Sequence, residues 1–213
     1  AWAELMRRLG YDGYGLHGND WGSIISPEVG RCDPEHVTGV HVNQIFSLPS
    51  GDPTELEKLS EEEKSNWQMF QWWSKNLGAY APLQSTVPQT LAHALADSPV
   101  GQLAWNSQLF GDALSFDYIL TNVTIYWLTN TAASSARIYY EDAHAKDVPT
   151  GPTTIPLGLS SFANDGPPVR LFAERDHKNI VSWNVYDSGS HFATQTAPDL
   201  LIGDIRTFFQ KLR

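Results

Sequence analysis

Gly18-Asn19-Asp20-Trp21-Gly22 is the stretch that decides the fold of this 213-residue chain. It has the spacing of a G-x-S-x-G nucleophile elbow, with aspartate in place of the serine. It follows a strand-like run, Tyr14–His17, and precedes Ser23–Ile25, which can open a helix. An elbow is a tight, strained turn, and its two glycines relieve clashes around the central residue. The pattern therefore predicts a strand, a sharp turn that carries Asp20, and a helix.

Asp20 differs chemically from a serine at the same place. A serine needs a base before it can attack, whereas a carboxylate is already anionic at neutral pH. We therefore expect Asp20 to attack a saturated carbon, such as that of an epoxide or an alkyl halide, and to form an ester with it. An aspartate beside turn glycines also occurs in ordinary loops, so the pentapeptide alone leaves that interpretation open.

Composition narrows the class of protein. Asp and Glu (24) outnumber Lys and Arg (14), and the net charge of −10 disfavours nucleic acid or an anionic membrane surface as a partner. The single cysteine, Cys32, predicts neither a disulfide framework nor a thiolate metal site. No apolar run reaches transmembrane length and no signal peptide precedes residue 1, so we expect a cytoplasmic protein.

Hydrophobic patterns divide the chain into three segments. Residues 1–46 alternate helix and strand around the elbow, which is typical of a parallel α/β sheet. Residues 47–145 predict only helices, one of them opened by a capping box at Ser60–Glu63, and we interpret them as an inserted helical cap. Residues 146–213 return to alternation. The elements expected there are strands at 154–159 and 180–185 and helices at 169–176 and from Pro198 onward.

Two further residues complete the chemistry that Asp20 suggests. Hydrolysis of an ester needs a base that activates water, normally a histidine held by a second carboxylate. Among the seven histidines, His191 lies in a turn after the strand at 180–185, and Asp165 follows the preceding strand. The order nucleophile, acid, histidine is the one found with such elbows. Each residue alone fits an ordinary turn, so the prediction depends on their joint placement.

Opening a strained ring also produces an alkoxide, which needs a proton or a strong hydrogen bond. Tyrosine hydroxyls suit this role because their pKa near 10 lies well below that of an alcohol. Tyr80 and Tyr139 are the favoured candidates, with Tyr126 and Tyr140 as neighbours of lower rank.

Several motifs along the whole chain resemble those of epoxide hydrolases of the α/β-hydrolase fold, most closely the microsomal-type branch. The stretches that carry this resemblance are Gly18–Ser23, Gln84–Thr90, Ala96–Gly101, Leu120–Val123 with Tyr126-Trp127, Ser134–Tyr139, Gly189–Ala193 and Ala197–Leu201. Several motifs in one order are more specific than any single motif.

The resemblance implies a role for each candidate residue. Asp20 is then the nucleophile, Asp165 the charge-relay acid, His191 the base, Tyr80 and Tyr139 the two cap tyrosines, and Trp21 part of the substrate pocket and oxyanion site. It also implies an epoxide as substrate, a vicinal diol as product, and neither cofactor nor metal, and the aromatic residues of the cap favour a small apolar epoxide.

Some alternatives stay open. The strand before the acid could also be aligned on Val148-Pro149-Thr150-Gly151, which would place Gly158 at the acid position. We prefer the alignment on Ile155-Pro156-Leu157-Gly158, because it keeps Asp165 at that position. The family's His-Gly-x-Pro motif does not precede the elbow, so we expect an amino-terminal part to be missing. The competing functions are a haloalkane dehalogenase, with Trp21 at a halide site, and an inactive truncated fragment or binding module.

Overall fold

The computed structural model describes residues 1–146 and 151–213, which group into two compact units. Ala1–Phe70 and Thr150–Arg213 form the first, here named the sheet unit, and Gln71–Pro149 form the second, the helical unit. The three segments predicted from the sequence stay a prediction, and residues 47–70 group with the sheet unit. Residues 148–150 of the alternative strand register lie outside the described residues.

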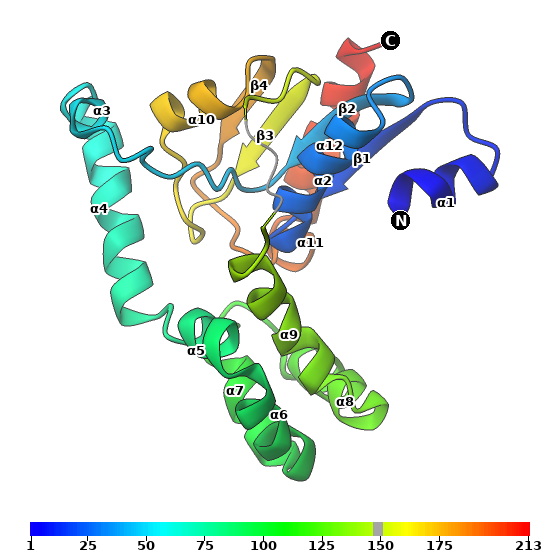
Figure 1. The fold of residues 1–213 in the computed structure, drawn as a ribbon, viewed down its shortest axis with the longest axis vertical. Coiled ribbons are helices and arrows are strands. Elements are labelled where there is room, and N and C mark those ends of the chain that lie inside the picture. Colours follow the sequence, from blue (N-terminus) through cyan, green and yellow to red (C-terminus); the bar gives the residue numbers. More distant parts are fainter. Residues whose placement is uncertain (147–150) are drawn as a thin grey trace. The chain divides into compact units, whose positions relative to one another are not determined.

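A four-stranded parallel sheet forms the centre of the sheet unit (Figure 1). Its strands are β1 (Tyr14–Gly18), β2 (Val37–Val42), β3 (Leu157–Ser161) and β4 (Ile180–Val185), and they lie in the order β1-β2-β3-β4. Every neighbouring pair is parallel. The α/β prediction is confirmed, and the parallel arrangement brings the carboxyl ends of all four strands to one edge of the sheet.

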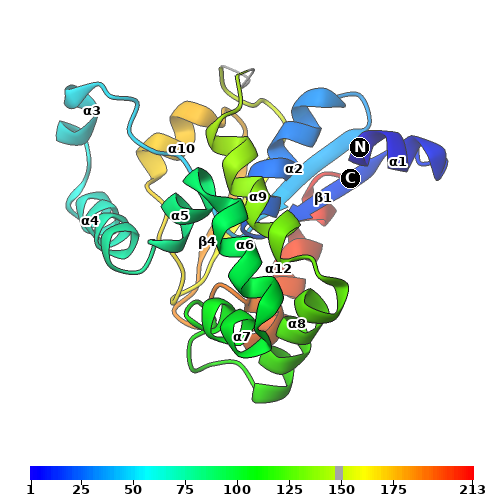
Figure 2. The same cartoon turned by 60° about the horizontal axis from the view of Figure 1, so that its bottom comes forward.

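Helices cover both faces of this sheet (Figure 2). Those of the sheet unit are α1 (Trp2–Arg8), α2 (Trp21–Cys32), α3 (Pro53–Glu57), the first turns of α4 (Glu61–Asn76), α10 (Arg170–Asp176), α11 (Ala193–Thr196) and α12 (Pro198–Lys211). Gly30 of α2 lies against Val40 of β2, whereas Gly39, the next residue back on the strand, lies against Phe208 of α12. Because successive strand residues point to opposite faces, α2 and α12 pack on opposite sides.

Glycines on three neighbouring strands allow α12 to approach the sheet closely. A Cβ atom added at Gly15 or Gly158 would lie 2.3 or 2.5 Å from Phe209 or Phe208 of α12, and one added at Gly39 would lie 2.3 Å from Leu212, directly after α12. The facing side chain Phe208 is fully buried, as are Leu157 and Leu159 of β3. Small residues on three adjacent strands thus form the groove into which the end of the chain packs.

Two local expectations need correction. The third strand begins at Leu157, not at residue 154, because Pro156 has no N–H to donate to a strand ladder and only its carbonyl oxygen is bonded, to Val40 N (2.8 Å). The spacing of apolar residues in the last helix predicts one buried face made of Leu200, Leu201, Ile205, Phe208, Phe209 and Leu212. Leu200 is instead 39% exposed, and the buried face contains a charged residue, Asp204.

The capping box predicted for the fourth helix is confirmed. Ser60 N donates to Glu63 Oε2 (3.0 Å), and Glu63 N donates to Ser60 Oγ (3.2 Å). The other carboxylate oxygen of Glu63 accepts from Leu171 N (2.8 Å), at the start of α10. One side chain therefore both starts α4 and joins its first turn to α10.

The helical unit is inserted in the chain between β2 and β3. It contains α5 (Tyr80–Thr86), α6 (Pro88–Asp97), α7 (Pro99–Ser107), α8 (Phe116–Thr129) and α9 (Ala132–Ala143). Here α9 packs against α5 and α6, and α7 packs against α8. The absence of strands from the described part of this insertion agrees with the predicted helical cap.

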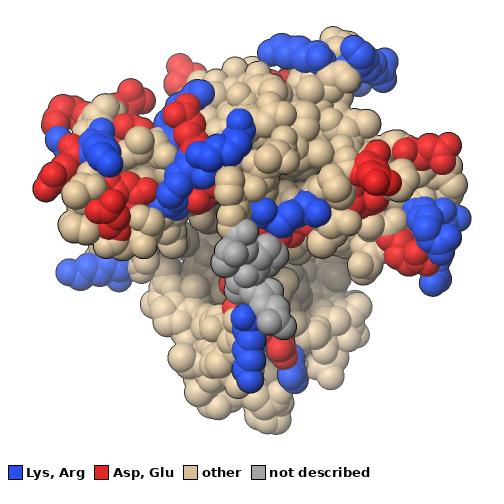
Figure 3. Space-filling view, turned by 45° about the horizontal axis from the view of Figure 1, so that its top comes forward, with Lys and Arg blue, Asp and Glu red and all other residues tan. Residues whose placement is uncertain are grey.

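The surface carries charges of both signs. Figure 3 shows acidic and basic side chains interspersed on the face that it displays. Pairs such as Arg137–Glu141 and Arg170–Glu174, each four residues apart on a helix, hold opposite charges 2.7 Å apart. Across residues 1–146 and 151–213, no helix combines the length and the apolar character that crossing a membrane requires.

Candidate active site

The nucleophile elbow forms as the sequence predicts. β1 ends at Gly18, α2 begins at Trp21, and Asp20 between them has φ 53° and ψ −122°, in the region that favours glycine. A Cβ atom at Gly18 would lie 2.0 Å from the carbonyl oxygen of Gly22, so only glycine fits there. The strained turn raises the side chain of Asp20 above the edge of the sheet.

The two carboxylate oxygens of Asp20 have different partners. Oδ1 accepts from the backbone N of Trp21 (2.8 Å), and Oδ2 lies 3.3 Å from Nε2 of His191. The side chain of Asp20 is 40% exposed, so a substrate can reach it. Oδ1 therefore lies where a backbone donor can stabilise developing negative charge.

Asp165 and His191 meet at the same edge. Nδ1 of His191 donates to Oδ1 of Asp165 (3.2 Å). Their loops are joined by a parallel bridge between Asn164 and Ser190, and Asn164 Nδ2 also donates to Gly189 O (3.1 Å). The structure thus brings together three residues that the sequence separates widely, and His191 lies between two carboxylates.

This arrangement changes the proton affinities of the site. Burial lowers the pKa of His191, but the hydrogen bonds and charges of Asp165 and Asp20 outweigh burial and raise that pKa to about 10. Burial likewise raises the pKa of Asp20, but the hydrogen bond and positive charge of His191 lower it overall. The two acidic neighbours of His191 therefore favour its protonated form at neutral pH.

Gln44 also lies in the site, although the sequence analysis did not single it out. It follows β2 closely, is 5% exposed, and its side chain contacts Asn19, Asp20 and Asp165. A polar residue directly after a parallel strand is a signal that could have found it, because such residues lie at the edge where ligands bind.

The candidate tyrosines belong to the helical unit, which brings them together. Tyr80 begins α5 and Tyr139 lies on α9; their ring centroids are 5.9 Å apart at 84°. Trp73 packs edge-on against Tyr80 at 6.3 Å. Two hydroxyl-bearing rings on facing helices suit a shared oxygen acceptor, and their roles stay a prediction.

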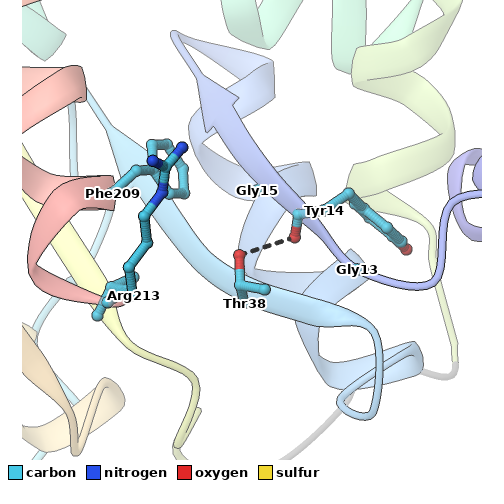
Figure 4. Close-up of a pocket in the computed structure, with 7 residues that line it drawn as sticks. Gly13, Tyr14, Gly15, Thr38, Phe209 and Arg213 are labelled. Atoms are coloured by element: carbon cyan, nitrogen blue, oxygen red, sulfur yellow. Dashed lines mark hydrogen bonds between the residues drawn. The ribbon is translucent and has the colours of Figure 1, made fainter.

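A pocket of about 480 Å³ lies elsewhere in the sheet unit (Figure 4). It is lined by Gly13, Tyr14, Gly15 and Thr38, and by Phe209, Leu212 and Arg213 at the end of the chain. Thr38 Oγ1 donates to Tyr14 O (3.1 Å) along its wall. These residues mark the amino ends of β1 and β2, opposite the elbow, so the pocket is separate from the candidate active site.

Known proteins resemble this chain along its whole length. The protein named "Putative epoxide hydrolase" from Stigmatella aurantiaca is 40% identical over 225 residues, which cover 100% of this chain and 50% of that protein. Epoxide hydrolase 1 from Sus scrofa is 30% identical, covering 96% of this chain and 52% of the relative. The solved structure of Aspergillus niger epoxide hydrolase matches with a TM-score of 0.83 at 28% identity, covering 99% of this chain and 55% of that one.

These matches cover nearly all of this chain but only about half of each relative. No protein-family model matches the chain. The chain spans about half the length of the curated relatives it matches. The predicted resemblance is confirmed over that half in sequence and in architecture. Over that half, the chain is similar in sequence and in architecture to epoxide hydrolases of the α/β-hydrolase fold.

Proposed function

We propose that the whole protein hydrolyses an epoxide to a vicinal diol through an ester on Asp20. The observation that carries this proposal is the line of contacts from Asp20 Oδ2 to His191 Nε2 (3.3 Å) and from His191 Nδ1 to Asp165 Oδ1 (3.2 Å). A carboxylate nucleophile paired with a carboxylate-held histidine suits two-step hydrolysis of a saturated electrophile.

In the first step, Asp20 attacks a carbon of the epoxide ring. Oδ1 is bound by Trp21 N, so Oδ2 is the oxygen that forms the new C–O bond. The bond between that carbon and the ring oxygen breaks, and the oxygen leaves as an alkoxide that takes a proton. Tyr80 and Tyr139, which lie together in the helical unit, are the proposed donors.

In the second step, His191 activates water against the ester. Ester formation removes the negative charge of Asp20, and with it one of the causes that raise the pKa of His191. The imidazolium of His191 then releases its proton to solvent, which returns one to the tyrosine that lost it. The neutral imidazole takes a proton from water as the water oxygen attacks the ester carbonyl carbon. Trp21 N–H stabilises the oxyanion on Oδ1. Collapse of this intermediate breaks the bond between the carbonyl carbon and the alkoxy oxygen, which takes the proton held by His191 and leaves as the diol. The acid proton left on Asp20 returns to His191 and restores the carboxylate.

Isotope labelling tests this mechanism. A single turnover in ¹⁸O-water should place label in Asp20, because water attacks the ester carbonyl and not the substrate carbon. Asp20→Asn should abolish turnover, and His191→Gln should let the ester accumulate, visible as a mass increase on the protein. Label that enters the diol directly in the first turnover contradicts the ester mechanism.

Haloalkane dehalogenation uses a similar nucleophile and base. Trp21, directly beside the nucleophile, would suit a halide site, whereas the pair Tyr80 and Tyr139 favours an epoxide oxygen. Halide release from a haloalkane, together with no turnover of styrene oxide, would favour the dehalogenase. The inactive fragment stays the remaining alternative, and failure of both substrates would support it.

We further propose a small apolar epoxide as substrate, since the rings of Trp73 and Tyr139 both pack against Tyr80. A panel of aryl, alkyl and polar epoxides tests this, and preference for polar members would contradict it. A cytoplasmic location and the absence of a nucleic-acid partner stay predictions, to be tested by cell fractionation and by binding to duplex DNA.

A further inference from the structure

Each strand of the sheet contributes one residue to the candidate site, and the contribution of β2 has no assigned role. Asp20 follows β1, Asp165 follows β3 and His191 follows β4. Gln44 follows β2, which lies between β1 and β3 in the sheet. The strand order therefore places the Gln44 side chain between the nucleophile and the charge-relay acid.

The side-chain amide of Gln44 has a partner for each of its bonding positions. Oε1 accepts from Asp20 N (2.7 Å) and lies 3.1 Å from Ser23 Oγ. Nε2 donates to Asn19 Oδ1 (2.7 Å) and to Asp165 Oδ2. Asn19 in turn donates from Nδ2 to the carbonyl oxygen of His191 (3.1 Å). A fully bonded amide with 5% exposure is held in one orientation.

The partners themselves determine which way this amide points. The backbone N–H of Asp20 can only donate, so it requires the oxygen of Gln44. Oδ2 of Asp165 accepts at this contact, so it requires the nitrogen of Gln44. A flipped amide would set N–H against N–H and oxygen against oxygen. The orientation therefore follows from chemistry at two independent contacts.

We propose that Gln44 is a positioning residue that fixes Asp165 relative to the nucleophile elbow, so that Asp165 Oδ1 stays directed at His191. This inference rests on the proposed function, in which His191 must meet the ester on Asp20. By holding Oδ2, Gln44 prevents the carboxylate from rotating away from the imidazole. By holding Asp20 N, it ties the same amide to the strained turn.

The surroundings of Gln44 make a charge substitution informative. The titratable groups among its partners and theirs are Asp20, Asp165 and His191. His41, three residues back on β2, contacts His17 and Ser160 instead. Gln44→Glu keeps the shape and the acceptor toward Asp20 N, but it replaces the donor toward Asp165 with an oxygen. Two carboxylates at this distance must share a proton.

The first test measures folding and needs no activity. Gln44→Glu should be destabilised relative to wild type by an amount that grows as pH rises from about 4 to 8, because the shared proton is lost. The sign follows because the introduced carboxyl has a raised pKa in the folded state, so its stability is present at low pH and lost as pH rises. Adding Asp165→Asn restores a donor and should remove this dependence. The proposal is overturned if the stability difference between Gln44→Glu and wild type does not depend on pH, or if the same pH dependence persists in the double variant.

The second test separates positioning from a general structural role. With styrene oxide, Gln44→Glu should form the Asp20 ester at a rate within about threefold of wild type and hydrolyse it at least about tenfold more slowly at pH 8. The rate of ester hydrolysis in wild type divided by that in Gln44→Glu should approach one as pH falls. Equal slowing of both steps, or no slowing of hydrolysis, overturns the positioning role.

A third variant keeps the comparison valid. Gln44→Leu removes the donor without adding charge. Its rate of ester hydrolysis, relative to that of wild type, should therefore be the same at every pH. A pH dependence like that of Gln44→Glu contradicts the shared-proton explanation. A wild-type protein that forms no ester contradicts the proposed function, whereas the folding measurements still decide whether Gln44 holds Asp165.

Discussion

Removing the charge of Asp20 should make His191 a base near neutral pH. The substitution Asp20→Asn keeps the shape of the side chain and its Oδ1 bond to Trp21 N, but it removes the negative charge 3.3 Å from His191 Nε2. The same charge disappears when the ester forms. The variant therefore reproduces the electrostatic environment in which His191 has to activate water.

The size of the change follows from the distance. Two unit charges 3.3 Å apart attract by about 5 kcal/mol at an effective dielectric constant of about 20. The side chain of Asp20 is 40% exposed, so water screens this attraction, and we take about half of it. About 2.5 kcal/mol corresponds to about two pH units. The pKa of His191 should therefore fall from about 10 to about 8.

Histidine NMR measures this directly. The imidazole signals of His191, assigned with His191→Gln, are followed against pH in wild type and in Asp20→Asn. Asp165→Asn is the matched control; its side chain is only 11% exposed, so less screening should give a larger fall in pKa. A fall of less than about half a pH unit in Asp20→Asn would refute the idea that ester formation switches His191 into a base.

Three further outcomes concern folding. Burial, and next the charge of a neighbouring histidine, lower the pKa of His41 from 6.5 to about 4. The free energy of unfolding should therefore decrease by up to about 3 kcal/mol as pH falls from 6.5 to about 4. Denaturant titrations of wild type and of His41→Gln check this, and the decrease should be smaller in the variant. Gly18→Ala should prevent ester formation and destabilise the fold because its Cβ meets a carbonyl oxygen at 2.0 Å, whereas Gly13→Ala, with 3.7 Å to the nearest atom, should leave both nearly unchanged. Glu63→Ala should lower the free energy of unfolding by about 1 kcal/mol because it removes the capping box of α4. Glu62→Ala, at an exposed position, should lower it by less than about 0.5 kcal/mol. Equal melting temperatures of the two variants would contradict this.

Much of the sheet unit was predictable because its signals are local. The glycine spacing around Asp20 predicts the elbow, since only a residue without Cβ tolerates a carbonyl oxygen 2.0 Å away. Apolar runs bounded by turn residues predict β1, β2 and β4, and the capping box predicts the start of α4. Asp165 and His191 could be proposed because the order of elements implies that the ends of parallel strands share one edge.

The remaining features depend on contacts between distant residues. The burial of Asp204 in α12 follows from partners on other elements, Ser160 on β3 and Asn184 Nδ2 (2.7 Å) on β4, which no helical periodicity reveals. The meeting of Tyr80 with Tyr139 likewise depends on how α5 packs against α9. In each case side chains far apart in the sequence meet through packing of their elements.

The sequence by itself determined the chemistry at Asp20, the alternation of strands and helices, and the order in which nucleophile, acid and histidine occur. Only the tertiary structure decided that Gln44 lies between Asp20 and Asp165 with every bonding position of its amide occupied. The physical reason is that spacing and periodicity describe neighbours along the chain. Which strand lies between two others, and which polar atoms it brings together, depends on sheet order and register.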